Sequence, residues 1–188
     1  DLSMRIAEKN RDTKETKIYE KINLDGNGNS DIDTGIGFFD HMLTLFAFHS
    51  NFDLVVKADG DLEVCDHHTI EDCRILSGKL FLEALGDKKG IARYGSMNLP
   101  MDEVLCNVTL DISGRPYLVF NCELIRENIG TMSCEMVEEF FRAFCVAAGV
   151  TLHINVYYGK NDHHKVEAIF KAFGRALKQA VKKESDRI

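Results

Sequence analysis

Two copies of one short pattern contain most of the side chains that could bind a metal. The pattern Asp-His-His-x-x-Glu occurs at residues 66–71 and again at 162–167, and the two copies hold four of the seven histidines. Imidazole and carboxylate groups are common ligands of divalent transition metals. A single copy is more typical of a polar helix start than of a site, but its repetition favours a metal centre.

Helical geometry limits how each histidine pair can be used. Asp66 and Asp162 are suitable N-caps, and apolar residues at helical spacing follow the second copy. We therefore expect each pair in the first turn of a helix, with the glutamate on the face of one of its histidines. Adjacent residues of a helix diverge by about 100°, so the two rings of one pair are poorly placed to bind one ion. The pattern predicts two metals, each shared between the copies.

Composition excludes several other classes of function. The formal net charge is −7, and no run of lysine or arginine is present. Nucleic acid and anionic membrane surfaces are therefore not expected as partners. No apolar stretch approaches the roughly 20 residues needed to cross a bilayer, and the polar start lacks a signal-peptide pattern. These features predict a cytoplasmic protein.

The six cysteines are spread along the chain without a Cys-x-x-Cys spacing. They are expected to be reduced, small core residues. A thiolate ligand from Cys65 or Cys73, which flank the first histidine pair, is the alternative. Carboxylates at the matching positions of the two copies favour a harder site of imidazole and oxygen ligands instead.

The elements that would position these residues form two similar series. In the first series, the apolar spacing predicts strands at 5–10 and 16–24, a helix at 38–48, a strand at 52–58 and a helix to about Leu85. In the second, it predicts strands at 93–99, 103–111 and 117–122, a helix at 134–148, a strand at 151–158 and a helix to about Lys182. Each series ends with helix, strand, turn and histidine-pair helix, which indicates an internal duplication with a period of about 95 residues.

The duplication predicts an α+β fold, a two-layer α/β sandwich built from two similar half-domains. Each half is expected to be a mostly β sheet with two helices on one face, with boundaries at 1–88 and 89–188. Whether the halves pack through their sheets or through their helices is left open by the pattern.

Superposition of the halves adds two ligand candidates. His41 lies 26 residues before His67, and Glu139 lies 24 residues before His163, both in the preceding helix. The complete candidate set for the metals is His41, His67, His68, Glu71, Glu139, His163, His164 and Glu167. Eight ligands are enough for two metals that each keep positions open for water or substrate.

Several longer motifs resemble the imidazoleglycerol-phosphate dehydratase family, over nearly all of the chain. They are Arg-Asp-Thr-Lys-Glu-Thr at 11–16, Gly-Phe-Phe-Asp-His-Met-Leu at 37–43, Asp-His-His at 66–68 with Glu-Asp at 71–72, Asp-Ile-Ser-Gly-Arg-Pro-Tyr at 111–117, and Asn-Asp-His-His at 161–164 with Phe-Lys-Ala-Phe at 170–173. The resemblance implies a lyase of histidine biosynthesis, a hydro-lyase that dehydrates imidazole glycerol phosphate to imidazole acetol phosphate. It also implies two Mn²⁺ ions per active site, bound at the eight positions above. One departure is Glu139, because many members have histidine there.

The resemblance further implies the residues that contact the substrate and carry the proton. The implied substrate-binding residues are Glu15, His41, His49, His67, His68, Arg93, Arg115, His163 and Lys171. The implied proton carrier is Glu15, Glu71 or Glu167, and the residues do not decide among them. From spacing alone, Arg93 and Arg115 are equally compatible with surface salt bridges, His49 with packing, and Glu15 with any exposed strand residue.

The family also implies a homo-oligomer of 24 subunits with active sites between subunits, which agrees with histidine pairs that complete sites with a neighbour. Two alternatives remain. One is a metal-storage protein without catalysis, which has no need of cationic phosphate ligands. The other is a dinuclear hydrolase acting on a small phosphorylated molecule.

Overall fold

The computed structural model of the chain describes residues 4–14, 16–60 and 67–184, except for the side chains of residues 60, 67, 68 and 74–76. The first half contains β1 (Ile6–Asp12), β2 (Thr16–Asn23), β3 (Ser30–Asp33), α1 (Gly37–Ser50), β4 (Asp53–Gly60) and α2 (His67–Leu85). The second half contains β5 (Tyr94–Met101), β6 (Val104–Asp111), β7 (Tyr117–Asn121), β8 (Asn128–Ile129), β9 (Met132–Ser133), α3 (Glu135–Ala148), β10 (Thr151–Tyr158) and α4 (Asp162–Val181).

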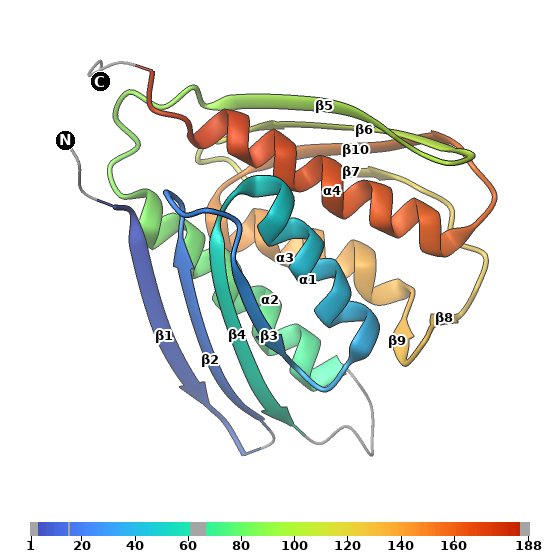
Figure 1. The fold of residues 1–188 in the computed structure, drawn as a ribbon, viewed down its shortest axis with the longest axis horizontal. Helices are drawn as coiled ribbons and strands as arrows, with labels where there is room; N and C mark the ends of the chain where they lie inside the picture. The colour runs from blue at the N-terminus through green and yellow to red at the C-terminus, as the bar shows by residue number, and fades with distance from the viewer. Residues whose placement is uncertain (1–3, 15, 61–66, 185–188) are drawn as a thin grey trace.

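The two halves have the same topology (Figure 1). The strand order is β1-β2-β4-β3 in the first sheet and β5-β6-β10-β7 in the second. In each sheet the first strand pairs antiparallel with the second, and the strand before the first helix runs parallel to the strand after it. The α+β fold and the internal duplication predicted from the sequence are confirmed.

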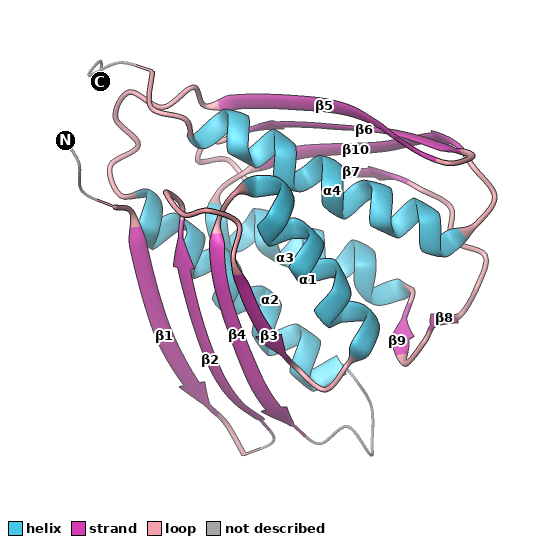
Figure 2. Ribbon diagram, in the orientation of Figure 1, coloured by secondary structure: helices cyan, strands magenta, loops and turns pink. Residues whose placement is uncertain are grey.

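The four helices lie between the two sheets (Figure 2). Helix α2 packs on β1 and β2, and helix α4 packs on β5 and β6. The halves meet through their helices, since α1 packs against α4 and α2 against α3. This answers the question that the sequence pattern left open. An apolar sheet face and an apolar helix stripe must each be buried, and four helices in the middle bury both at once.

Aromatic side chains fill the space where the halves meet. Phe46 of α1 stacks on Phe173 of α4 with ring centroids 5.3 Å apart. Phe39 of α1 meets Phe140 of α3 edge to face at 5.8 Å. These rings lie at the helical spacing recognised in the sequence, and they are buried as expected. Such pairs add to the burial of apolar area, so the helix interface forms one continuous core.

Three short strands were not anticipated. β3 has four residues, of which only Ile32 is partly buried, so its apolar alternation is too short to recognise. β8 and β9 have two residues each and form a small hairpin before α3. Within the described part of the chain, no helix is long and apolar enough to cross a membrane.

Gly95 allows β5 to approach helix α4. A Cβ atom built at this position would lie 1.9 Å from the carbonyl oxygen of Ala176, which belongs to backbone and cannot rotate away. We expect Gly95→Ala to lower the free energy of unfolding by about 1–3 kcal/mol, because the sheet and the helix must separate. Urea unfolding followed by circular dichroism measures this change.

Gly37→Ala is the matched control, because a Cβ atom there meets nothing within 4 Å. Gly37 is the first residue of α1, and removing a glycine from a helix favours the folded chain by about 0.5–1 kcal/mol. Equal stability of the wild type and Gly95→Ala would contradict the close approach of β5 and α4.

Candidate active site

Three of the predicted ligands meet where α1 packs on α4. The Nε2 atom of His41 lies 3.3 Å from Oε1 of Glu167, and Nε2 of His163 lies 2.8 Å from the same oxygen. Ligand atoms of these three residues all lie within 4.8 Å of one another. Gly174 makes the close helix approach possible, since a Cβ atom there would lie 3.0 Å from the carbonyl oxygen of Phe46. Two imidazoles and a carboxylate at this separation suit a divalent transition metal.

The electrostatics of this group favour an ionised carboxylate. Burial by itself raises the pKa of Glu167, but the hydrogen bonds with His163 and His41 offset it, so the pKa is lowered overall. The Nζ atom of Lys171, one turn further along α4, lies 3.6 Å from Oε2 of Glu167 and contributes in the same direction. The His163 ring packs edge to face on Phe38 at 5.0 Å, which holds it in place.

The rings of the second histidine pair diverge, as the helical geometry predicts. His163 faces Glu167, whereas His164 faces Glu103 in the turn between β5 and β6. The Nδ1 atom of His164 lies 2.7 Å from Oε1 of Glu103, and its Nε2 atom lies 3.9 Å from Oδ2 of Asp102. His164 is therefore turned to a different surface from the three-residue group.

The start of helix α4 differs from the expectation. The N-cap is Asn161, whose side chain accepts a hydrogen bond from the backbone amide of His164, and Asp162 is the first helical residue. Asp162 is buried instead, and its Oδ2 accepts hydrogen bonds from the backbone amides of Ile125 and Arg126 at 2.9 and 2.7 Å. The prediction that Asp162 caps the helix was wrong because this long-range contact binds its carboxylate. Asp66, the predicted cap of the first copy, lies outside the described residues.

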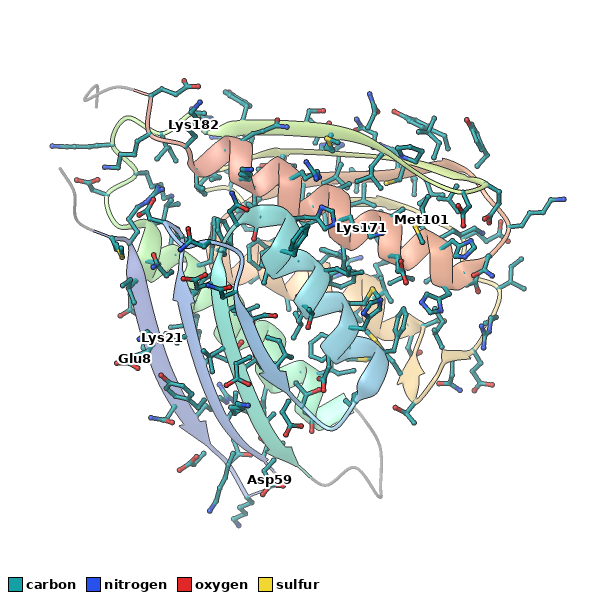
Figure 3. The ribbon with its side chains drawn as sticks, viewed as in Figure 1. Glu8, Lys21, Asp59, Met101, Lys171 and Lys182 are labelled. Atoms are coloured by element: carbon teal, nitrogen blue, oxygen red, sulfur yellow. The ribbon has the colours of Figure 1, made fainter. Side chains whose placement is uncertain are left out.

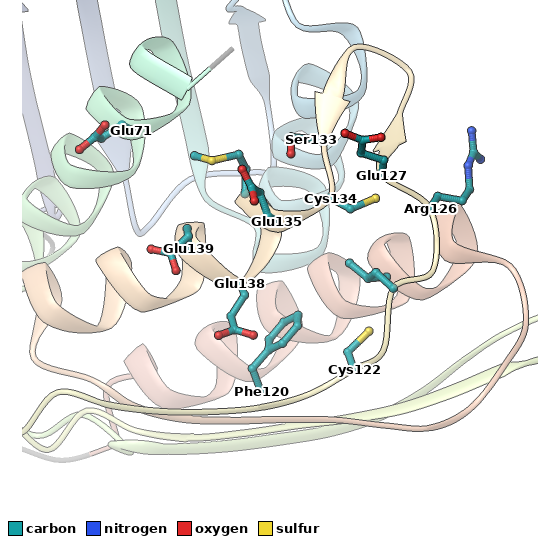
Figure 4. A pocket seen from close by; sticks show the side chains of 12 residues that line it. Glu71, Phe120, Cys122, Arg126, Glu127, Ser133, Cys134, Glu135, Glu138 and Glu139 are labelled. Carbon is teal, nitrogen blue, oxygen red and sulfur yellow. The ribbon is translucent and has the colours of Figure 1, made fainter. Parts of the chain in front are cut away.

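Glu71 and Glu139 line a second candidate site, which the internal duplication relates to the site formed by His41, His163 and Glu167. Glu71 on α2 and Glu139 on α3 border a pocket of about 790 Å³ (Figure 4). His41 and Glu139 each lie four residues after the first residue of their helices, Gly37 and Glu135. Helices α2 and α3 pack on each other as α1 and α4 do. The equivalence proposed from the sequence is therefore consistent with the fold.

This pocket is strongly acidic. The described residues of its wall include one arginine and five glutamates, which are Glu71, Glu127, Glu135, Glu138 and Glu139. Arg142 of α3 lies 2.6 Å from Glu138 and 3.8 Å from Glu139. His67 and His68 belong to α2, but their side chains lie outside the described part of the chain. Among described residues, only His41, His163 and Glu167 bring three donor atoms together.

Cationic side chains flank the three-residue group on α4. Lys171 reaches toward β5, where its Nζ atom lies 3.5 Å from Sδ of Met101 (Figure 3). Arg175 follows one turn later and donates from Nε to Nδ1 of His49 at 3.0 Å. Burial, Arg175 and Lys171 all lower the pKa of His49. His49, Lys171 and Arg175 therefore lie on the same surface.

The two other cationic residues predicted to bind the substrate, Arg93 and Arg115, lie at the far end of α4. Arg93 has a positive φ of 75°, and its backbone amide donates to the carbonyl oxygen of Ala180. Its guanidinium binds both oxygens of Asp111, at 2.6 and 3.1 Å. Arg115 lies 4.0 Å from the same carboxylate. Within one chain the two arginines form a salt-bridge cluster with Asp111, which matches the alternative recognised in the sequence.

Several residues of this region were missed from the sequence. Glu103 and Arg175 bind histidines that lie far from them in the chain. Each is a single charged residue, one in a turn and one on a helix, so no sequence pattern distinguishes it from other surface charges. Glu15, a candidate from the sequence, lies outside the described residues. Cys73 is buried, and burial raises its pKa well above the usual value, so a thiolate ligand there is disfavoured. The five described cysteines are all unpaired, as expected.

Comparison with known proteins agrees with these features. The family model of imidazoleglycerol-phosphate dehydratase matches residues 34–177. The protein named imidazoleglycerol-phosphate dehydratase from Clostridium botulinum is 62% identical over 176 residues, which are 94% of this chain and 90% of the relative. The relative of that name from Acetivibrio thermocellus is 59% identical over 184 residues, which are 98% of this chain and 94% of the relative.

Solved structures give the same result. The crystal structure of imidazoleglycerol-phosphate dehydratase from Staphylococcus aureus is 50% identical, with a TM-score of 0.84 over 93% of this chain and 97% of that chain. The Pyrococcus furiosus structure is 36% identical, with a TM-score of 0.81 over 96% of each chain. The matches extend over both halves of the duplication and over all the described ligand candidates from His41 to Glu167. The chain belongs to the imidazoleglycerol-phosphate dehydratase family.

Proposed function

We propose that the chain is a manganese-dependent hydro-lyase of histidine biosynthesis, which converts imidazole glycerol phosphate into imidazole acetol phosphate in the cytoplasm. Membership of the family supports the dehydratase activity. The observation that carries the metal dependence is the convergence of His41, His163 and Glu167 on one point. Two imidazoles and a carboxylate suit a divalent transition metal, and the resemblance to the family implies that this metal is Mn²⁺.

The bound metal would supply Lewis-acid polarisation of the substrate imidazole. The residues of the chain supply the rest. Lys171, 3.6 Å from Glu167, places a positive charge beside the metal ligands and suits the phosphate end of a small substrate. Arg93 and Arg115 offer guanidinium groups that bind phosphate bidentately, but they lie at the other end of α4. They suit a substrate bound at a site completed by another subunit.

The two ligand groups support sites between subunits. Within one chain, His41, His163 and Glu167 supply three donors, while His164 faces Glu103 and lies outside this group. We propose that two Mn²⁺ ions per active site are each bound by donors from both halves of the duplication, with a neighbouring chain bringing His164 and the α2–α3 ligands to the same place. We propose a homo-oligomer with sites between subunits on this basis, and the resemblance to the family implies 24 subunits.

The proton carrier is proposed among Glu15, Glu71 and Glu167. Glu167 is buried and bonded to two histidines, which favours a role as metal ligand. Glu71 borders the open pocket of about 790 Å³ and can reach a bound molecule. A correctly placed acid or base is worth about 10²–10⁴ in rate.

The test is an assay of metal-free protein with imidazole glycerol phosphate, before and after addition of Mn²⁺. We expect loss of substrate and appearance of the keto phosphate, followed by NMR, only in the metal-loaded sample. A metal-storage protein would bind Mn²⁺ without converting the substrate, and a hydrolase would release inorganic phosphate. Either of these two results would reject the proposed dehydration.

A further inference from the structure

Glu103 uses both of its carboxylate oxygens to hold the start of helix α4. Oε2 accepts hydrogen bonds from the backbone amides of Lys160 and Asn161 at 3.0 and 2.8 Å. Oε1 lies 2.7 Å from Nδ1 of His164. Two backbone amides and one ring nitrogen therefore converge on this carboxylate, an arrangement that suits a group that only accepts hydrogen bonds.

An ionised carboxylate can only accept hydrogen bonds, so it determines the tautomer of the histidine that it contacts. Nδ1 of His164 must carry the proton that Glu103 accepts. The lone pair of the neutral ring then lies on Nε2, which points away from Glu103. Metal-bound histidines commonly have this arrangement, in which the second ring nitrogen donates to a carboxylate.

The duplication places a second glutamate at the same point of the chain. Glu103 lies one residue before β6, and Glu15 lies one residue before β2. β2 and β6 hold the same position in their sheets, each beside the first strand.

We propose that Glu103 is a positioning residue of the metal centre, which holds His164 with Nδ1 protonated and Nε2 free to bind the ion. The proposal rests on the metal dependence of the proposed function and adds a residue that acts through a ligand. Glu103 also fixes the turn at residues 160–161, so it sets both the tautomer of the ring and the place of the helix start that carries it.

Glu103→Gln tests the effect on the tautomer of His164 separately from the effect on the turn at residues 160–161. The amide oxygen of glutamine can still accept from the backbone amides, but its NH₂ group then faces Nδ1 and favours the opposite tautomer, with Nε2 protonated. We expect the dissociation constant for Mn²⁺ at the site that uses His164 to rise about 10- to 100-fold. Titration of the metal-free oligomer followed by the EPR signal of free Mn²⁺ measures this directly, without an activity assay.

A double-mutant cycle with His164→Ala distinguishes positioning from a general loss of structure. If Glu103 acts through His164, Glu103→Gln has no further effect on Mn²⁺ binding once His164 is replaced. Asp87→Asn is the matched control, because Oδ1 of Asp87 also accepts a backbone amide in an exposed turn, from Lys89 at 3.0 Å. We expect wild-type Mn²⁺ binding from this control.

The outcomes also distinguish this proposal from the proposed function. Wild-type Mn²⁺ affinity in Glu103→Gln, or additive effects in the cycle, would overturn the role of Glu103 and leave the dehydratase activity standing. Metal binding that depends on Glu103, without conversion of imidazole glycerol phosphate, would reject the dehydratase and retain the positioning role. A wild-type protein that binds no Mn²⁺ would overturn both.

Discussion

Glu167→Gln is expected to abolish metal binding at the α1–α4 site and to reduce dehydratase activity by about 10³-fold or more. The carboxylate of Glu167 lies between His41 and His163, with its Oε1 atom 3.3 and 2.8 Å from their Nε2 atoms. An amide has nearly the same shape but carries no charge, and it donates where the carboxylate accepts. Metal content after gel filtration and the rate of substrate loss measure the two effects.

Glu8→Gln is the matched control for this change. Glu8 lies on the exposed β1 strand, where its Oε2 atom accepts a hydrogen bond from the hydroxyl of Tyr19 at 2.6 Å. The same chemical substitution there should leave metal content and rate at the wild-type level. Full activity of Glu167→Gln would show that the site formed by His41, His163 and Glu167 does not bind the essential metal.

Glu20→Gln is expected to make the stability of the protein much less dependent on pH. Glu20 is fully buried on the inner face of β2, and Ser77 of α2 donates to its Oε1 atom at 2.5 Å. Among the described residues, its Oε2 atom has no hydrogen-bond partner. Burial raises the pKa of Glu20 to about 8, while the bond from Ser77 lowers it by less.

The direction of this pH dependence follows from the protonation of Glu20 in the folded and the unfolded chain. A glutamate of the unfolded chain loses its proton near pH 4.5, but folded Glu20 keeps its proton until about pH 8. The stabilisation from the protonated side chain is therefore complete below pH 4.5, falls as the pH rises between these values, and is lost above pH 8. The full change is on the order of 4–5 kcal/mol, at about 1.4 kcal/mol for each pKa unit.

Urea unfolding of wild type and Glu20→Gln at pH 5, 6.5 and 8.5 measures this effect. We expect the free energy of unfolding of the variant, relative to wild type, to rise with pH. Cys73 on α2 is a second buried titratable group near Glu20, and burial raises its pKa well above the usual range, so it stays a thiol throughout. A constant difference between the two proteins over this range would mean that Glu20 does not change its protonation on folding.

The sequence indicated Glu20 only indirectly. Thr16, Ile18, Glu20 and Ile22 alternate along β2, and all four are buried. Strand periodicity thus places Glu20 on the inner face, but it cannot supply the partner, because Ser77 lies on a helix 57 residues away. The same limit applies to Glu103 and His164, which are 61 residues apart in the chain. A polar contact of this kind depends on how elements pack, and no local pattern contains that information.

The sequence by itself determined the major elements, the internal duplication and the identity of most ligand candidates. These properties follow from local periodicity, from capping and turn residues, and from repeated motifs, all of which are read within a short window of the chain. The divergence of His163 and His164 also followed from the sequence, since it depends only on the geometry of an α-helix.

Only the tertiary structure decided which residues meet. It joined the halves through their helices, brought His41 to Glu167 across the α1–α4 contact, and turned His164 toward Glu103. It also made Asn161 the N-cap of α4, because the carboxylate of Asp162 accepts hydrogen bonds from the backbone amides of residues 125 and 126. The physical reason is the same in each case. A side chain with several possible partners takes the one that packing brings within reach, and packing depends on the whole chain.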